Sequence, residues 1–259
     1  MTTLLLVGCG KMGGALLRGW RESGAADRFA VVEPAGGDGF LTDPEALPQD
    51  LAPDVVVLAV KPQMMDAALP AYCRFARPGT VFLSIAAGKT LGYFARQLGG
   101  ETAVVRAMPN TPAAVGRGIS VACANAQVSA AQRALSDRLL AAVGEVAWVE
   151  DERLIDPVTA VSGGGPAYVF LLIEVLAKAG AAAGLPEALA MRLARSTVAG
   201  AGELARLSPE PASRLRENVT SPKGTTLEAL KILMGENGIE RLFVAAIAAA
   251  TRRSRELAD

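Results

Sequence analysis

Continuous apolar runs alternate with amphipathic segments through the first half of the chain. The runs predicted to be strands are Thr3–Val7, Phe29–Glu33, Val55–Val60, Thr80–Ile85, Ala103–Ala107, Gly118–Ala124 and Glu145–Val149. Lys11–Ser23 and Ala130–Val143 have helical character. Strands that are apolar throughout are typical of a parallel sheet covered on both faces, and their alternation with helices indicates βαβ units. We therefore expect residues 1–150 to form an α/β domain with a parallel sheet.

The pattern changes after residue 150, where no further strand is predicted. Ala, Leu, Glu and Arg recur at helical spacing. The helices expected here are Asp151–Val161, Pro166–Ala183, Pro186–Leu207, Pro211–Asn218, Thr226–Glu236 and Ile239–Leu257. Three of these helices begin at a proline, which is favourable because the N–H of the first helical residue has no intrahelical partner to lose. Residues 151–259 are therefore predicted to form a second domain that is all-α.

Composition and charge are those of an ordinary globular protein. Lys and Arg number 26 and Asp and Glu number 26, so the net charge of zero gives no reason to expect nucleic acid or a membrane surface as partner. The apolar run Ala167–Ile173 is interrupted by Glu174 and Lys178, whereas a membrane span needs about 20 apolar residues, so a buried helix is predicted there. The N-terminus lacks the features of a signal peptide, which favours a cytoplasmic location.

Two features of composition limit the chemistry. The chain contains no histidine, so no imidazole can act as general base, proton shuttle or metal ligand, and Ser-His-Asp and Cys-His hydrolase mechanisms are excluded. The three cysteines, Cys9, Cys73 and Cys123, form no CxxC pair, and no metal site is predicted. Catalysis has to rely on hydroxyls, lysines, carboxylates, backbone amides or a bound cofactor.

A glycine-rich segment directly follows the first predicted strand and opens the first predicted helix. It matches GxGxxG and consists of Gly8, Cys9, Gly10, Lys11, Met12 and Gly13. In this context the pattern indicates dinucleotide binding. The first glycine allows a tight turn, the second lets the backbone approach a pyrophosphate, and the third lets helix and strand pack closely. The phosphates would then meet the positive end of the helix dipole. The alternative is a plain glycine-rich βα turn.

Glu33 closes the second predicted strand, twenty residues after Gly13. An acidic side chain in this place can accept hydrogen bonds from the adenosine ribose, and it would repel a 2′-phosphate. The segment PAGGDG that follows contains no arginine. The residue therefore favours NADH over NADPH, although a solvated strand end is the alternative.

The ends of three further strands carry candidate site residues. Ligands of open parallel sheets bind beyond the carboxyl ends of the strands, where Ala59, Val60, Lys61 and Pro62 follow one strand. Small residues including Ala86 and Ala87 end the next strand and suit a backbone lying against a nicotinamide ribose. The stiff loop at 108–112 could include a cis bond; it either shapes the substrate site or turns the chain.

Two segments of the helical half also suggest chemistry. The three consecutive glycines at 163–165 are unfavourable inside a helix and indicate either close backbone approach or a joint between helices. The loop NVTSPKGTT, residues 218–226, presents amides and hydroxyls at the start of a helix, which is a natural carboxylate site. The alternative is a polar capping loop in which Thr226 is the N-cap.

Taken together, these segments resemble the pyrroline-5-carboxylate reductase family along essentially the whole chain. The motifs that carry the resemblance are GCGKMG, LAVKPQ, SIAAG, RAMPNTPA, VSGGGPAY, VTSPKGTTLEAL and ATRRSREL. The resemblance implies a Rossmann domain followed by a helical domain through which subunits form a homodimer or a higher homo-oligomer. It also implies reduction of 1-pyrroline-5-carboxylate, a cyclic imine carboxylate, to L-proline with NADPH or NADH, the final step of proline biosynthesis.

The resemblance assigns roles to individual residues. Lys61, Pro62, Ala86 and Ala87 would line the nicotinamide ribose, and Asn218 would contact the cofactor across the subunit interface. The substrate would be held by the loop residues Ser221, Gly224, Thr225 and Thr226. Thr226 is the candidate catalytic hydroxyl near the substrate nitrogen, with orientation as its first role and proton relay as its second.

The chain departs from the family pattern in three places. Gly164 replaces a frequent Ser, Lys223 replaces a frequent Gly, and the segment between Glu33 and Asp54 leaves little room for a helix. The rival functions are a related imine reductase, a β-hydroxyacid dehydrogenase and a non-catalytic dinucleotide sensor. The dehydrogenases resemble a pattern with a lysine in the stretch that is Ala167–Val175 here, where none occurs, and a sensor would not need SPKGTT.

Overall fold

The computed structural model describes residues 1–258 and divides into two compact units. The first, called the sheet unit here, holds Met1–Gly164 and the C-terminal residues from Ala250 onward; the second, the helical unit, holds Gly165–Ala249. This division differs from the boundary expected at residue 150. The segment after the last strand stays with the sheet because Ile155 is buried in a cluster with Val121 and Cys123 of the strand Gly118–Ala124.

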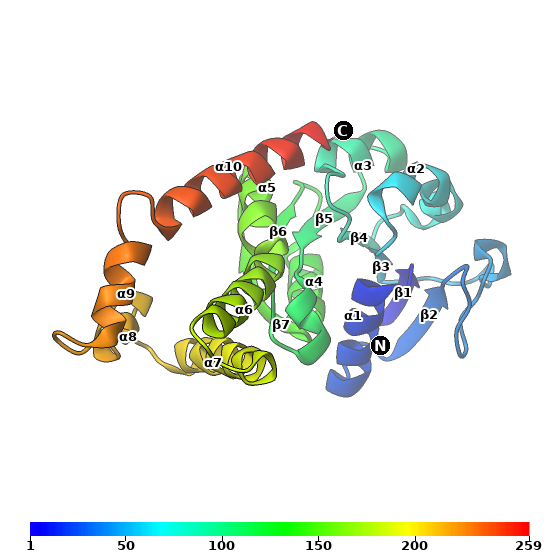
Figure 1. Cartoon of the computed structure of the whole chain (residues 1–259). Coiled ribbons are helices and arrows are strands. Elements are labelled where there is room, and N and C mark those ends of the chain that lie inside the picture. Colours follow the sequence, from blue (N-terminus) through cyan, green and yellow to red (C-terminus); the bar gives the residue numbers. More distant parts are fainter. Residues whose placement is uncertain (259) are drawn as a thin grey trace. The chain divides into compact units, whose positions relative to one another are not determined.

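Within the described residues, the strands form a single seven-stranded sheet in the order β2-β1-β3-β4-β5-β6-β7 (Figure 1). The strands are β1 (Thr3–Val7), β2 (Arg28–Val32), β3 (Val55–Leu58), β4 (Val81–Ser84), β5 (Ala103–Met108), β6 (Gly118–Ala124) and β7 (Gly144–Trp148). All neighbouring pairs are parallel except β5 and β6, which are antiparallel. The predicted strands and the Rossmann-type parallel sheet are confirmed, with this one antiparallel pair as the exception. The loop between Met108 and Gly118 is shorter than the dozen or so residues that a parallel crossover needs.

Both faces of the sheet are buried, as the apolar strands predicted. Successive residues of a strand point to opposite faces, so Leu4 and Leu6 join one core cluster while Leu5 and Val7 join another. The first face is covered by α1 (Lys11–Ser23) and α4 (Ala130–Ala141), and the second by α2 (Met65–Ala68), a 3₁₀ segment at Leu69–Phe75 and α3 (Leu91–Leu98). Trp20 on α1 is fully buried, and its Nε1 donates to the carbonyl of Leu139 on α4 at 2.7 Å.

The segment between β2 and β3 contains no α-helix, in agreement with its short length. A 3₁₀ turn at Pro44–Ala46 and a bridge between Val32 and Leu41 are its regular features. Further short turns of the sheet unit lie at Pro62–Met64, Thr111–Val115 and Glu152–Leu154. The last of these turns leads into α5 (Ile155–Val158).

The three glycines at 163–165 were expected to mark either close backbone approach or a joint between helices. In the structure the helical path continues through them. A π-helical turn at Thr159–Gly163 connects α5 to α6 (Gly165–Ala182). A Cβ at Gly163 would lie 2.6 Å from Cε of Met108, so this glycine allows a close approach to the end of β5. A π-helical turn inserts an extra residue into the hydrogen-bond ladder, which periodicity in the sequence does not report.

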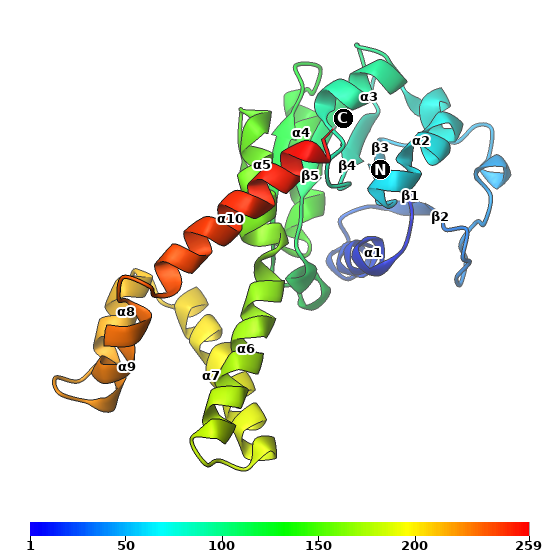
Figure 2. The same ribbon diagram turned by 45° about the horizontal axis from the view of Figure 1, so that its top comes forward.

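The helical unit contains α6, α7 (Glu187–Leu207), α8 (Ala212–Asn218), α9 (Thr225–Leu233) and most of α10 (Ile239–Glu256). Helices α6 and α7 pack along each other, with Gly180 close to Ala190 (Figure 2). Within α6, which the structure describes in full, Ala177 alone is buried. The expectation of a buried helix is therefore wrong for the isolated chain. By length and composition the helical stretch Glu152–Ala182 would suffice to cross a membrane.

Candidate functional site

The glycine-rich turn has the geometry that each of its glycines was expected to provide. Gly8 follows β1 with φ +89°, and a Cβ there would lie 2.9 Å from the carbonyl oxygen of Ala59. A Cβ at Gly13 would overlap the carbonyl oxygen of Gly8, so helix α1 can pack on the turn only because residue 13 is glycine. A Cβ at Gly10, by contrast, has no non-neighbouring heavy atom of residues 1–258 within 4 Å. The backbone at Gly10 is thus open to a ligand.

The start of α1 provides backbone donors beside this opening. Gly10 is the N-cap and supplies no side-chain cap, and no acidic residue stands in the first turn. Lys11 is exposed, whereas Cys9 and Met12 are partly buried and pack against the core. Burial, followed by the charge of Glu33, raises the pKa of the Cys9 thiol, so the thiol remains neutral. The amides, the helix dipole and the open space fit a dinucleotide pyrophosphate.

The Glu33 carboxylate is tied to the glycine-rich turn. Its Oε2 accepts from the backbone N–H of Cys9 at 2.6 Å, and its Oε1 accepts from the N–H of Ala35 at 3.0 Å. The residue is half-buried, and both of its carboxylate oxygens accept from backbone N–H groups. The carboxylate lies where the end of β2 meets the glycine-rich turn.

The other candidate cofactor residues follow the strands next to β1. Ala59 N–H donates to the carbonyl of Val7 at 2.8 Å, and Val60, Lys61 and Pro62 continue this segment, with Lys61 exposed. Because β3 and β4 are the next strands in the sheet, Ala86 and Ala87 lie at the same edge. The structure thus brings all the predicted cofactor residues of the sheet unit to the carboxyl ends of adjacent parallel strands.

Sequence reasoning missed the residue that holds the turn after β4. Ser84 is fully buried, and its Oγ accepts from the N–H of Ala86 at 3.3 Å. The signal was available, since Ser84 is the one polar residue of the TVFLSI strand after Thr80. A hydroxyl that replaces part of the strand ladder fixes the backbone of the following alanines.

The loop after β5 connects two parts of the sheet unit. Its peptide bonds are trans, as are all others in residues 1–258. Asn110 accepts from the N–H of Ile119 at 2.9 Å and donates to the carbonyl of Ser162 at 3.3 Å. Both ends of the side chain are occupied by backbone groups, which supports a role in turning the chain over a role in shaping the substrate site.

The loop between α8 and α9 belongs to the helical unit. Gly224 is the N-cap of α9, and Thr225 and Thr226 are the first two helical residues, so the alternative that Thr226 is the N-cap is wrong. Gly224 N–H donates to the carbonyl of Ser221 at 3.0 Å, and a Cβ on Gly224 would overlap the Ser221 hydroxyl. Among residues 1–258, Lys223 is the one non-glycine residue with positive φ, at 61°.

The amides and hydroxyls of this loop are accessible. Ser221, Thr225 and Thr226 are exposed, and the helix dipole of α9 favours an anion beside them. Asn218 is also exposed, and its Nδ2 donates to Glu210 at 3.0 Å. The arrangement can bind a small carboxylate.

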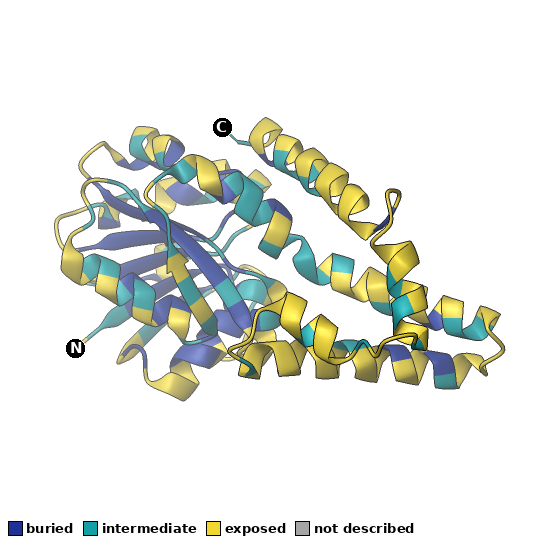
Figure 3. Cartoon of the chain, turned by 90° about the vertical axis from the view of Figure 1, so that its left-hand side faces the viewer, coloured by how far each residue is buried: buried dark blue, intermediate teal, exposed yellow. Residues whose placement is uncertain are grey.

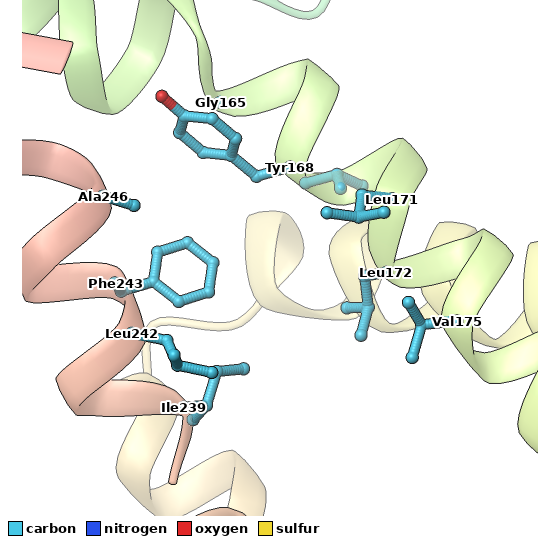
Figure 4. A pocket seen from close by; sticks show the side chains of 10 residues that line it. Gly165, Tyr168, Leu171, Leu172, Val175, Ile239, Leu242, Phe243 and Ala246 are labelled. Atoms are coloured by element: carbon cyan, nitrogen blue, oxygen red, sulfur yellow. The ribbon is translucent and has the colours of Figure 1, made fainter. Parts of the chain in front are cut away.

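The helical unit also has an apolar groove of about 510 Å³ between α6 and α10. Figure 4 shows Tyr168, Leu171 and Leu172 on one side and Leu242 and Phe243 on the other. The rings of Tyr168 and Phe243 meet edge to face, with centroids 6.0 Å apart. An apolar surface of this kind is typical of a protein interface.

Comparison with known proteins covers both halves of the chain. Residues 152–257 match the family described as pyrroline-5-carboxylate reductase dimerisation. Residues 3–88 match the family described as NADP oxidoreductase, coenzyme F420-dependent. The dimerisation region implies a homodimer.

Full-length relatives share one description. The chain is similar to pyrroline-5-carboxylate reductase from Pseudomonas aeruginosa, with 42% identity over 99% of this chain and 97% of the relative. The enzyme from Escherichia coli is 34% identical over 97% and 96% of the two chains.

Solved structures of similar proteins have the same fold as this chain along its whole length. The pyrroline-5-carboxylate reductase from Coxiella burnetii superposes with a TM-score of 0.91, at 33% identity over 100% of this chain and 99% of the other. The Plasmodium falciparum pyrroline carboxylate reductase with NADP bound gives a TM-score of 0.86, at 29% identity over 100% and 98%. The chain therefore belongs to the pyrroline-5-carboxylate reductase family, whose members are NAD(P)H-dependent oxidoreductases of proline biosynthesis.

Proposed function

We propose that this protein reduces 1-pyrroline-5-carboxylate to L-proline with a hydride from NADH or NADPH, the last step of proline biosynthesis. The observation that carries the proposal is the full-length similarity to the Pseudomonas aeruginosa reductase, which includes both the glycine-rich turn and the loop before α9. The geometry of the turn supports it, because Gly8 and Gly13 permit close packing and Gly10 leaves space for a pyrophosphate.

The dinucleotide is proposed to bind at the carboxyl ends of β1, β3 and β4. The residues assigned to it are Gly8, Cys9, Gly10, Lys11, Met12, Gly13, Glu33, Ala59, Val60, Lys61, Pro62, Ala86 and Ala87, together with Asn218 across the subunit interface. The amides at the start of α1 would bind the phosphates, and the small residues after β4 would let the nicotinamide ribose lie against the backbone.

The substrate is proposed to bind at the loop before α9. Ser221, Gly224, Thr225 and Thr226 would hold its carboxylate with hydroxyls and backbone amides, favoured by the helix dipole. Thr226 would place its hydroxyl near the ring nitrogen. Its position at the second residue of α9 supports this role, because its side chain is not used as the N-cap.

The chemistry requires little acid catalysis. A bound nicotinamide supplies the hydride, and a cyclic imine accepts it most readily as the iminium, which is already protonated on nitrogen. The chain can therefore do without histidine. Its own residues would bind the carboxylate, orient the ring and exclude water, and such positioning can supply most of the rate.

Preference for NADH is proposed on the basis of Glu33. A carboxylate at the end of β2 accepts from ribose hydroxyls and repels a 2′-phosphate. The two backbone N–H groups that bind Glu33 support the proposal, since they hold the charge at the adenosine side of the site.

A homodimer or higher oligomer formed through the helical unit is proposed to be the active state in the cytoplasm. The exposed apolar faces of α6 and α10 support this assembly. The balanced charge gives no reason for a nucleic-acid or membrane partner.

The test is a reductase assay with 1-pyrroline-5-carboxylate, run in parallel with NADH and NADPH. Formation of proline at a rate that saturates with both substrates is the expected result. Binding of dinucleotide without turnover of this imine would overturn the assignment and indicate a sensor. Turnover of other cyclic imines alone would indicate a broader imine reductase.

A further inference from the structure

The C-terminal turn of the chain is held on the sheet unit by a buried hydrogen bond. Ser254, near the end of α10, is 7% exposed, and its Oγ donates to Oδ1 of Asp156 on α5 at 2.8 Å. Nε of Arg255 lies 3.8 Å from the other carboxylate oxygen. The largely buried carboxylate of Asp156 therefore has a hydroxyl donor and a cation, both from one helical turn.

The next residues of this turn touch the segment that follows β4. Leu257 N–H donates to the carbonyl of Arg253 at 3.1 Å and so continues the helical turn. A Cβ on Gly88 would lie 2.7 Å from the Leu257 carbonyl oxygen. Gly88 also has φ +80°, a conformation that glycine favours. The C-terminal turn thus packs directly against the backbone at Gly88.

Gly88 directly follows the two alanines assigned to the nicotinamide ribose. The segment 84–91 is fixed at three places. The Ala86 N–H donates to Ser84 Oγ, and the Leu91 N–H donates to Glu152 Oε1 at 2.8 Å. Between them, Gly88 packs against Leu257. Two of these supports come from the sheet and from the start of the α5 segment. The remaining support is the C-terminal turn.

We propose that the C-terminal turn is a positioning element of the cofactor site. The hydrogen bond between Ser254 and Asp156 fixes the turn on the sheet unit, and Leu257 then contacts Gly88. This contact keeps the backbone of Ala86 and Ala87 in the conformation that receives the nicotinamide ribose. The inference rests on the proposed function, because it assumes that these alanines contact the dinucleotide.

The test is Ser254→Ala in the full-length assembled protein, with the dissociation constants of NADH and NADPH measured by calorimetry and the KM values measured by turnover. Loss of the hydroxyl is expected to raise both quantities for the dinucleotide about three- to tenfold, while the KM for the imine stays within about twofold. Ser254→Thr, which keeps the hydroxyl, is expected to restore dinucleotide binding.

Arg253→Ala is the matched control, because it removes the exposed ion pair with Glu256 on the same turn and is expected to leave dinucleotide binding unchanged. Gly88→Ala should also raise the dissociation constant of the dinucleotide. In the double variant with Ser254→Ala, the fold-increase should be smaller than the product of the two single fold-increases. Unchanged dinucleotide affinity in a Ser254→Ala protein that is merely less heat-stable would overturn the inference. Absence of turnover in the unsubstituted protein would instead overturn the proposed function.

Discussion

The two units of this molecule differ in how far their apolar side chains are buried. In the sheet unit, strand residues such as Leu5, Val56 and Phe82 are fully buried, and two large clusters fill both faces of the sheet. In the helical unit, Phe170 is 60% exposed and Leu242 is 66% exposed. Figure 3 shows the contrast, with buried residues concentrated in the strands and exposed residues along most of α7 and α10.

The difference indicates that the sheet unit completes its own core, whereas the helical unit needs another chain. Burial of a large apolar side chain contributes about 1.5–3 kcal/mol, and α6 and α10 leave many such side chains in solvent. The dimerisation family matched by residues 152–257 supplies the explanation. The helical stretch that includes α6 is apolar enough to cross a membrane, and it lies within the region that matches the dimerisation family.

The largest effect is expected from a charge in the apolar groove between α6 and α10, which tests whether the helical unit depends on a second chain. Leu171→Glu places a carboxylate on the exposed apolar face of α6, where an uncompensated buried charge costs about 4 kcal/mol, or about a thousandfold in association. Light scattering should show monomers at micromolar concentration, and turnover should be lost. Dinucleotide binding should be largely retained, because most of its site lies in the sheet unit.

Leu171→Met is the matched control, since it keeps an apolar side chain of similar size and should assemble normally. If the Leu171→Glu protein remained a fully active oligomer, the groove would not be part of the interface. The comparison between a self-sufficient unit and a dependent one would then need another basis.

A second substitution tests whether substrate and cofactor functions divide between the units. Thr226→Ala is expected to lower kcat by about a hundredfold, because it removes the hydroxyl proposed to orient the imine nitrogen. Dinucleotide affinity, measured by calorimetry, should be nearly unchanged. Equal loss of both would show that the loop before α9 is not the substrate loop. Thr226→Ser, which keeps a hydroxyl at the same position, should restore turnover.

The converse test uses the open space at Gly10. Gly10→Val adds a side chain where the protein has no contacting atoms, so thermal stability should be nearly unchanged. Dinucleotide affinity should fall at least about tenfold, which corresponds to about 1.4 kcal/mol, because the side chain occupies the approach of the pyrophosphate. Gly13→Ala is a contrasting variant that should destabilise the sheet unit, since its Cβ would overlap the carbonyl of Gly8. Normal affinity in Gly10→Val would place the phosphates elsewhere.

Local patterns in the sequence were sufficient for most of the secondary structure. The seven strands, the glycine-rich turn and the five helices after Gly165 follow from apolar periodicity, glycine chemistry and helix-start prolines. The direction of β6 did not follow, because an apolar run has the same pattern whether its neighbour is parallel or antiparallel. The π-helical turn at Thr159–Gly163 escaped for a similar reason, since periodicity describes only ordinary helices.

Long-range features were beyond these patterns. Ser254 and Asp156 are 98 residues apart, and nothing local shows that their side chains meet. The same holds for Glu33, whose acceptance of the Cys9 amide links the ends of two strands. For α6, the apolar composition predicted burial, but in this chain the helix is largely exposed, and the sequence pattern does not show what would cover it.

Glu33 provides the last and smallest test, which concerns the sheet unit alone. Its carboxylate either reads the ribose or only supports the glycine-rich turn, and two substitutions separate these roles. Glu33→Gln keeps one acceptor oxygen, which can receive the Cys9 N–H, but removes the charge, whereas Glu33→Ala removes both. If charge repulsion of the 2′-phosphate governs preference, both variants should raise the ratio of NADPH to NADH affinity by about fivefold, or about 1 kcal/mol. If the carboxylate serves only the turn, the ratio should stay constant, Glu33→Gln should bind both dinucleotides normally, and Glu33→Ala should weaken both equally. Calorimetry with the two dinucleotides distinguishes these outcomes without any need for turnover.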